Sequence, residues 1–262
     1  MVGLRLDANL KWLFTELPFV QRFEAAAAAG FSGVEYADPY PFVPAELARR
    51  LADAGVEQVL LNTPMGEPGT PGSQGYACLP DEVPAFRSGV LKALDYATVL
   101  KAGLVHVVGG IVPEGVAPER AFAQYVANIA WAAEQAKGTG ITLVLEAQNK
   151  RSAPGFVLAG QASAAAVVEA VGADHVGLLM DFFHLQIDEG DLSESYARFR
   201  PLIRHLQVAD VPGRNEPGTG EINYRHLFRT ILDSGYDGWI GCEYTPAGTT
   251  TDGLRWIEEL TP

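Results

Sequence analysis

Cysteine and basic residues are both scarce in this 262-residue sequence, and each shortage excludes a class of protein. The two cysteines, Cys78 and Cys242, lie far apart and match no CxxC or zinc-finger spacing, which argues against a thiolate metal site. Both are expected to be buried as small apolar side chains. Lysine and arginine number 19 against 32 acidic residues, a formal net charge of −13. Without a basic cluster to bind phosphates, nucleic acid is not an expected partner.

Long hydrophobic runs are missing as well. No apolar run approaches the ~20 residues needed to cross a bilayer, so no membrane association is expected. Residues 1–9 lack the basic stretch and following apolar stretch of a secretory leader. We therefore expect a cytoplasmic protein.

Short apolar runs alternate with longer amphipathic stretches along the chain. The runs are rich in Val, Ile and Leu, as is typical of parallel strands covered on both faces. They predict strands over Leu4–Leu10, Gly33–Tyr36, Val56–Asn62, Leu104–Val108, Thr142–Glu146, Val176–Asp181, Ile203–Val208 and Gly238–Glu243. The amphipathic stretches predict helices over Phe19–Ala29, Pro44–Ala54, Glu82–Ala102, Pro118–Lys137, Gln161–Val171 and Asn223–Ser234. Glycines follow these helices, where a left-handed C′ residue is favoured, at Gly30, Gly55, Gly103, Gly140, Gly172 and Gly235.

Eight strands separated by helices in one uninterrupted series predict an α/β fold, a single (β/α)8 TIM barrel over residues 1–262. The alternative is a doubly wound open sheet. That fold usually carries a GxGxxG turn after its first strand, and Asn9-Leu10-Lys11-Trp12 does not match it. No linker divides the chain, which predicts one domain. The Gly- and Pro-rich segment Pro64–Pro80 is expected to form a loop over one end of the barrel, as a candidate lid.

Oxygen-bearing side chains stand at the ends of the last four predicted strands: Glu146, Asp181, Gln207 and Glu243. In this fold, catalytic residues come from the C-terminal ends of the strands. Three carboxylates at one barrel mouth repel one another unless a cation compensates or one keeps its proton. Carboxylate and amide oxygens without a thiolate favour Mg²⁺ or Mn²⁺ as the divalent metal. Gly241 shares the strand face of Glu243, which would leave room beneath the site.

Each of these residues also has a simpler interpretation. A single carboxylate after a strand is often a helix N-cap or a solvated loop charge, but four oxygen donors in succession favour the metal site. His184 could hydrogen-bond a substrate oxygen, or plug the loop together with Phe182 and Phe183. Arg214 could bind a substrate carboxylate through two N–H groups, or pair with Glu216.

Other polar and aromatic candidates are weaker. His106 lies inside the fourth predicted strand and is expected to be a hydrogen-bonded barrel residue rather than a ligand. His205 shares the strand face of Gln207 one layer deeper and is expected to orient it. Trp12 and Phe14 follow the first strand, where they either wall the pocket or pack in the core.

Several segments of the chain carry a family resemblance: DANLKWLF from Asp7, GVEY from Gly33, HLQVAD from His205, RNEPGTGEINY from Arg214 and GWIGCEY from Gly238. These segments resemble hydroxypyruvate isomerase, a family within the wider xylose isomerase-like barrels. The similarity runs from about Leu6 to Trp256, and the EPGTGE segment is rather specific. The family usually has Glu-Pro-Ile-Asn after the fifth strand, whereas this chain has Glu146-Ala147-Gln148-Asn149.

The resemblance implies that Glu146 and Glu243 form the catalytic pair and that the four oxygen donors surround a divalent metal. It also implies that His184 and Arg214 contact the substrate. The implied reaction converts hydroxypyruvate to 2-hydroxy-3-oxopropanoate (tartronate semialdehyde) through an enediolate. The implied partners are a small hydroxy-keto acid or ketose and further copies of the chain in a homo-oligomer.

Other functions use similar barrels. A ketose 3-epimerase or a 2-oxo-tetronate isomerase would use the same carboxylate pair on a longer substrate. A non-catalytic sugar-binding barrel is the alternative of another class. A metal-dependent abasic-site endonuclease would need a histidine-rich multi-zinc site and a cationic surface, and the sequence has neither.

Overall fold

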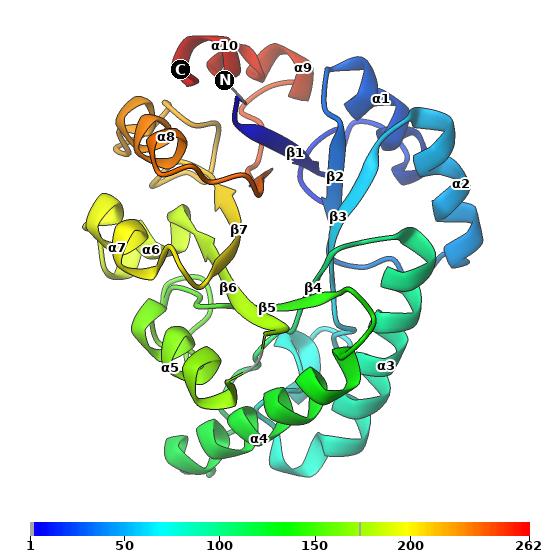
Figure 1. Cartoon of the computed structure of the whole chain (residues 1–262), viewed down its shortest axis with the longest axis vertical. Coiled ribbons are helices and arrows are strands. Elements are labelled where there is room, and N and C mark those ends of the chain that lie inside the picture. Colours follow the sequence, from blue (N-terminus) through cyan, green and yellow to red (C-terminus); the bar gives the residue numbers. More distant parts are fainter. Residues whose placement is uncertain (1–2, 173) are drawn as a thin grey trace.

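Eight parallel strands pair in sequence order, and β8 pairs with β1 to close a barrel (Figure 1). The structure is a computed structural model that describes residues 3–172 and 174–262, so the first two residues of the N-terminal segment lie outside it. The strands are β1 (Arg5–Asn9), β2 (Gly33–Tyr36), β3 (Glu57–Asn62), β4 (Leu104–His106), β5 (Thr142–Glu146), β6 (Val176–Asp181), β7 (Ile203–Val208) and β8 (Trp239–Cys242). The (β/α)8 prediction is confirmed, and the open sheet is excluded.

Helices surround the barrel in Figure 1. They are α1 (Arg22–Ala28), α2 (Pro44–Ala54), α3 (Val83–Leu100), α4 (Pro118–Ala136), α5 (Gln161–Val171), α6 (Phe182–Asp188), α7 (Leu192–Phe199), α8 (Tyr224–Asp233), α9 (Thr250–Gly253) and α10 (Arg255–Leu260), with 3-10 turns η1 (Phe19–Gln21), η2 (Pro71–Gln74) and η3 (Pro80–Glu82). Within the described residues, no helix combines the length and apolarity that a bilayer crossing requires.

Six of these helices match the predicted amphipathic stretches, and the short helices after β6 and β8 were not predicted. His184 therefore lies in the first turn of α6 rather than in a loop. The helix begins directly after β6 because the Asp181 carboxylate accepts the backbone N–H of Phe183 at 2.8 Å. An N-cap of this kind was the alternative interpretation of an acidic residue after a strand, and at Asp181 it applies.

Left-handed glycines end four helices as predicted. Gly55 and Gly172 are the C-caps of α2 and α5, and Gly30 and Gly235 directly follow the C-caps of α1 and α8. The prediction for Gly103 is wrong. Helix α3 ends two residues earlier, where Lys101 adopts the left-handed conformation (φ 57°) and its N–H bonds the carbonyl groups of the last turn. A lysine cap carries no pattern that distinguishes it from an ordinary helical lysine.

Two apolar layers hold the barrel together. The larger one packs the outer faces of the strands against the helices. The smaller one fills the lower barrel interior with Val59, Leu60, Val144 and Leu179, against which Trp239 packs. Gly33 makes room for that indole, since a Cβ there would lie 2.7 Å from the Trp239 ring. The floor of the barrel is therefore apolar and closed, and polar side chains gather above it.

Strand register decides which of those polar side chains become neighbours. Residues paired across parallel strands project to the same side of the sheet. Asp181 on β6 pairs with Gln207 on β7, which in turn pairs with Gly241 on β8. Asn9 on β1 pairs with Glu35 on β2. The register thus brings two of the predicted metal ligands side by side at the C-terminal end of the barrel.

Candidate active site

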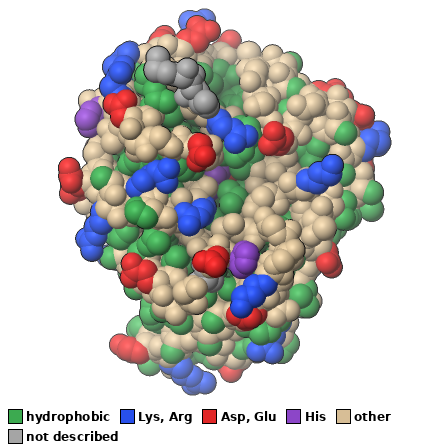
Figure 2. All heavy atoms as spheres, in the orientation of Figure 1, with side chains coloured by type: hydrophobic (Ala, Val, Ile, Leu, Met, Phe, Trp, Pro, Cys, Tyr) green, Lys and Arg blue, Asp and Glu red, His purple; other side chains and the backbone are tan. Residues whose placement is uncertain are grey.

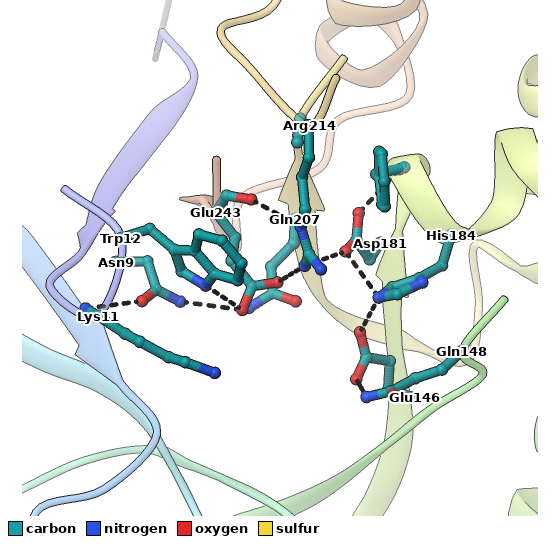
Figure 3. Close-up of polar contacts among 12 residues, drawn as sticks. Asn9, Lys11, Trp12, Glu146, Gln148, Asp181, His184, Gln207, Arg214 and Glu243 are labelled. Atoms are coloured by element: carbon teal, nitrogen blue, oxygen red, sulfur yellow. Dashed lines mark hydrogen bonds and ion pairs between the residues drawn. The ribbon is translucent and has the colours of Figure 1, made fainter. Parts of the chain in front are cut away.

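A cavity of about 210 Å³ opens at the C-terminal end of the barrel. Its wall includes Glu146, His184, Gln207, Arg214 and Glu243. Asp181 is fully buried just behind that wall, within 3.5 Å of His184 Nε2 and 3.4 Å of Arg214 Nη2. All six residues predicted from the sequence therefore meet at one place (Figure 3). Met65 and Gln74 from the predicted loop Pro64–Pro80 also line the cavity.

The loop after β7 places Arg214 at the cavity. Asp210 organises this loop, because its carboxylate accepts the backbone N–H groups of Val211, Gly218, Gly220 and Ile222 at 2.8–3.0 Å. Gly220 is required at its position, since a Cβ there would lie 2.0 Å from the Val211 carbonyl oxygen. The backbone N–H groups of Gly218 and Gly220 thus bind a carboxylate of the chain itself.

Arg214 is bound on several sides. Its Nη2 group donates to Glu243 Oε2 at 2.7 Å and to Asp181 Oδ2 at 3.4 Å. Its guanidinium carbon lies 4.6 Å from the Trp12 ring centroid and 4.9 Å from that of Phe183. Glu216, the alternative partner predicted for Arg214, instead accepts the backbone N–H of Ala247. Arg214 therefore holds the β6 and β8 carboxylates in place.

Glu243 lies just beyond the end of β8, and two further side chains donate to it. Trp12 Nε1 donates to Oε1 at 3.1 Å, and Asn9 Nδ2 approaches the same oxygen at 3.4 Å. Trp12 consequently belongs to the pocket, whereas Phe14 is buried in the core. With Arg214 included, Glu243 receives three donors, and its orientation is fixed.

Glu146, at the end of β5, has a different environment. Gln148 Nε2 donates to its Oε2 at 2.8 Å, and His106 Nε2 lies 3.7 Å from the same oxygen. His106 is buried but has no hydrogen bond at Nε2 among the described residues, so the predicted hydrogen-bonded role for it is wrong. It lines the cavity because β4 ends there and its ring faces inward.

His184 is fixed as one tautomer. The backbone N–H of Asn149 donates to its Nδ1 at 3.1 Å, so in the neutral ring the proton sits on Nε2. Burial, reinforced by the Arg214 charge, lowers the pKa of His184 to about 4, so the ring is neutral near pH 7. Its Nε2–H faces Asp181 Oδ2 at 3.5 Å and Glu146 Oε1 at 3.7 Å. His184 is therefore a hydrogen-bond donor toward the cavity.

The carboxylates repel one another in this buried site. Burial and the charges of Glu243 and Asp181 raise the pKa of Glu146 well above its usual range. Burial also raises the pKa of Glu243 and of Asp181, while Arg214 opposes both shifts. These same carboxylates outweigh the effect of burial on Arg214 and raise its pKa. The cluster thus favours an added cation or a retained proton.

Gln207 is oriented by a residue that the sequence analysis did not single out. Its Nε2 donates to Glu35 Oε1 at 2.7 Å, and His205 Nε2 lies 2.7 Å from Glu35 Oε2. His205 therefore acts on Gln207 only through Glu35. Glu35 fits beside Gly241, where a Cβ would lie 2.4 Å from its Oε1. The room expected beneath Glu243 is filled by this carboxylate.

The donor set fits a divalent cation of the Mg²⁺ or Mn²⁺ type. Glu146, Asp181 and Glu243 would supply carboxylate oxygens, and the amide oxygen of Gln207 has no hydrogen bond within the described part of the chain, because the amide bonds Glu35 through Nε2. Ligand atoms of Glu146, Asp181 and His184 also lie within 4.8 Å of one another. We favour Gln207 over His184 as the ligand because the His184 Nε2 carries a proton in its fixed tautomer.

Comparison with known proteins shows the family of the chain. A family model described as xylose isomerase-like TIM barrel matches residues 23–260. The chain belongs to this family. The resemblance inferred from the sequence motifs is confirmed. Within the family, this chain is 41% identical over 255 residues to the hydroxypyruvate isomerase of Escherichia coli K12, covering 97% of this chain and 98% of the relative.

Two further relatives are similar over the full chain. A 2-oxo-tetronate isomerase from Cupriavidus necator is 41% identical over 254 residues and covers 97% of both chains. A solved structure described as an AP endonuclease of family 2 from Brucella melitensis is 37% identical, covers 100% of both chains and superposes with a TM-score of 0.94. The two curated relatives are named as isomerases, in agreement with the reaction class expected from the sequence motifs.

Several residues that line the cavity were not identified from the sequence, among them Asn9, Lys11 and Gln148. Asn9 and Lys11 owe their positions to the way β1 ends, and Gln148 belongs to the segment that departs from the usual family pattern. An inward-facing side chain two residues past a strand has no periodic signal of its own. Only the path of the backbone turn decides where it points.

Proposed function

We propose that the protein is an isomerase of small 2-oxo acids, converting hydroxypyruvate to 2-hydroxy-3-oxopropanoate through an enediolate. One observation carries this proposal. Glu146 from β5 and Glu243 from the end of β8 line the same cavity of about 210 Å³. Two carboxyl groups would therefore contact a small substrate bound in that cavity. The names of the two curated relatives support the same reaction class.

Glu243 is suited to act as the base. It accepts hydrogen bonds from Arg214 and Trp12, and both donors stabilise its ionised form. In the proposed reaction this carboxylate removes a proton from the hydroxymethyl carbon of the substrate, and the electron pair moves toward the carbonyl to form the enediolate. Arg214 keeps the carboxylate in position during the transfer.

Glu146 is suited to return a proton on the other side. Gln148 is its one close hydrogen-bond donor among the described residues, and burial with two neighbouring carboxylates raises its pKa. Burial raises the pKa of Glu243 as well, but Arg214 opposes that shift, which leaves Glu146 the better proton donor of the two. Glu146 would deliver its proton to the former carbonyl carbon. The hydroxyl proton passes from the oxygen of the former hydroxymethyl carbon to the oxygen of the former carbonyl, so that the first carbon becomes the aldehyde and the second carries the hydroxyl. General acid–base catalysis of this kind contributes roughly 10²–10⁴-fold.

Glu146, Asp181, Gln207 and Glu243 are the residues proposed to hold a divalent metal. When bound, such a cation would stabilise negative charge that develops on the carbonyl and hydroxyl oxygens of the substrate. His184, whose Nδ1 accepts the Asn149 N–H, is proposed to donate from Nε2 to one of these oxygens. Arg214 keeps Nη1 free of a hydrogen bond within the described residues and is proposed as a second substrate contact.

A substrate panel tests the proposal. The metal-loaded protein would be assayed with hydroxypyruvate, with 2-oxo-tetronate and with neutral ketoses of increasing length, and products would be identified by NMR. We expect turnover of the 2-oxo acids and none of the ketoses. The 2-oxo-tetronate isomerase activity is the second candidate, because a curated relative of that name is equally similar at 41% identity. Epimerisation of ketoses without turnover of either acid would overturn the proposal.

A further inference from the structure

We propose that Lys11 binds the carboxylate of the substrate and thereby selects 2-oxo acids over neutral ketoses. This inference rests on the proposed function, because it assigns the residue that recognises the acid group of that substrate. Lys11 lies in the cavity wall, and nothing in the sequence motifs gives it a role.

The carboxylates of this site would repel an anionic substrate. Glu146 and Glu243 line the cavity and Asp181 lies just behind its wall, and each of these groups, when ionised, would repel a substrate carboxylate. Arg214 is the obvious counter-charge, but its Nε and Nη2 groups already face the Glu243 carbonyl and the Glu243 and Asp181 carboxylates. The edge of the guanidinium that would bind a carboxylate at two points is thus occupied by the protein's own groups. A substrate carboxylate that lies away from the proposed metal position therefore needs a further cation.

Lys11, two residues after the end of β1, is that cation. The Asn9 side-chain oxygen accepts the backbone N–H of Lys11 at 3.1 Å, and the Asn9 carbonyl accepts those of Trp12 and Leu13 at 3.0 and 2.8 Å. This turn directs the side chains of Lys11 and Trp12 over the cavity. Trp12 reaches Glu243, and Lys11 extends along the cavity beside it (Figure 3).

The Lys11 ammonium is free to take a ligand. Among the residues that the structure describes, no carboxylate lies within ion-pair distance of it. The Trp12 ring lies beside it, with its centroid 5.4 Å from Nζ. The side chain is exposed, so binding a substrate anion requires little desolvation of the ammonium. An ammonium on a flexible side chain can bind the carboxylate of either a three-carbon or a four-carbon acid.

This placement also orders the substrate. Lys11 is next to Trp12, which bonds Glu243, so a carboxylate held by Lys11 keeps the neighbouring oxo and hydroxyl carbons beside the proposed base. A neutral ketose offers no negatively charged group for this ammonium. The charge at position 11 therefore gives preference for 2-oxo acids within a barrel whose catalytic glutamates would also serve a ketose.

The test compares Lys11→Met, which keeps a long unbranched side chain but removes its charge, with Lys11→Arg. The matched control is Lys137→Met, which removes one positive charge from an exposed position directly after α4. For each protein, kcat and KM for hydroxypyruvate would be measured, together with binding of D-glycerate and of dihydroxyacetone by calorimetry. D-Glycerate carries a carboxylate, and dihydroxyacetone is a neutral molecule of the same chain length.

We expect Lys11→Met to lower kcat/KM at least about 10-fold, chiefly by raising KM, as loss of a contact made equally in ground and transition states does. Glycerate binding should weaken by a similar factor while dihydroxyacetone binding is unchanged, and Lys11→Arg should retain most of both values. An unchanged KM and glycerate affinity would overturn the proposal. Equal weakening of both ligands would also overturn it, because it would indicate a structural role.

The two proposals can fail separately. Wild-type protein that binds glycerate through Lys11 but does not isomerise hydroxypyruvate contradicts the proposed function and leaves the carboxylate subsite intact. Wild-type protein that isomerises hydroxypyruvate while Lys11→Met matches it contradicts the subsite alone. Wild-type protein that binds no glycerate also contradicts the subsite.

Discussion

The Gln207 amide donates to the Glu35 carboxylate at 2.7 Å, and this one bond decides which end of the amide faces the cavity. Glu35 is fully buried, and its second oxygen is paired with His205 at 2.7 Å. Burial alone would raise the pKa of Glu35, but the His205 charge lowers it, and so do the hydrogen bonds that Glu35 accepts from His205, Gln207 and Asn9. An ionised Glu35 accepts hydrogen bonds only, so the Gln207 Oε1 must point to the other side, toward the site.

Glu35→Gln should therefore weaken the proposed metal site. The new amide can donate to Gln207 as well as accept from it, which permits the Gln207 amide to flip and present its NH₂ group to the cation. We expect Mn²⁺ affinity, measured by calorimetry, to fall by about 10-fold or more, as is usual when the partner of a ligand is lost. Asp7→Asn is the control, because Asp7 is equally buried and has no hydrogen bond to Gln207. Unchanged affinity in Glu35→Gln would show that the amide is oriented by other contacts.

Replacing either proposed catalytic glutamate tests the chemistry itself. Glu146→Gln and Glu243→Gln should each lower kcat for hydroxypyruvate by at least about 100-fold, because both proton transfers depend on a carboxyl group. Circular dichroism and thermal unfolding would verify that the barrel is intact. A variant that keeps near-normal turnover would remove that glutamate from the mechanism.

The pH dependence of stability reports on the buried carboxyl groups. A carboxyl whose pKa is raised in the folded protein binds its proton more tightly there than in the unfolded chain, so its contribution to stability is present at low pH and is lost as the pH rises through the raised pKa. Glu146 has such a pKa, caused first by burial and then by Glu243 and Asp181. In chelator, Glu146→Gln should therefore have a higher Tm than wild type at pH 8 and a matching Tm at pH 4.

The expected Tm difference at pH 8 is about 2 °C or more, the change that ~1 kcal/mol produces in a domain of this size. Scanning calorimetry of both proteins from pH 4 to pH 8 would measure it. Glu114→Gln, at an exposed position, controls for the loss of one carboxyl group. A Tm difference that does not grow with pH would mean that Glu146 is not forced to hold a proton.

Metal removal should abolish turnover if the four oxygen donors hold a catalytic cation. We expect dialysis against chelator to eliminate hydroxypyruvate turnover and Mg²⁺ or Mn²⁺ to restore it, since hard oxygen donors suit these ions. Full activity in chelator, or recovery with Zn²⁺ alone, would contradict the assigned donor set.

Much of the fold was readable from the sequence because each barrel strand is a short apolar run with a polar end. Glu146, Asp181, Gln207 and Glu243 could be found from the residue type at the end of each run, since the fold collects all strand ends at one mouth. Their convergence on one cavity, with Asp181 just behind its wall, agrees with that expectation. Gly241 could likewise be identified from the period of two along β8.

The contacts between side chains could not be read in the same way. Glu35 lies within β2 and becomes important only because the register and Gly241 place it under Gln207. His106 was expected to be hydrogen-bonded, and its free Nε2 among the described residues depends on how far β4 extends. Lys11 depends on a local turn that Asn9 closes with its side chain. Such contacts arise from tertiary packing, which single-residue patterns do not encode.

Solvent-deuterium incorporation tests the central claim most directly. Hydroxypyruvate would be turned over by the metal-loaded protein in D₂O, and the product would be analysed by NMR. Since one glutamate takes the proton and a different one supplies the replacement, we expect one deuterium at the new hydroxyl-bearing carbon of 2-hydroxy-3-oxopropanoate. Product without label at that carbon would mean that hydrogen moves directly between the two carbons, and it would contradict the two-glutamate mechanism.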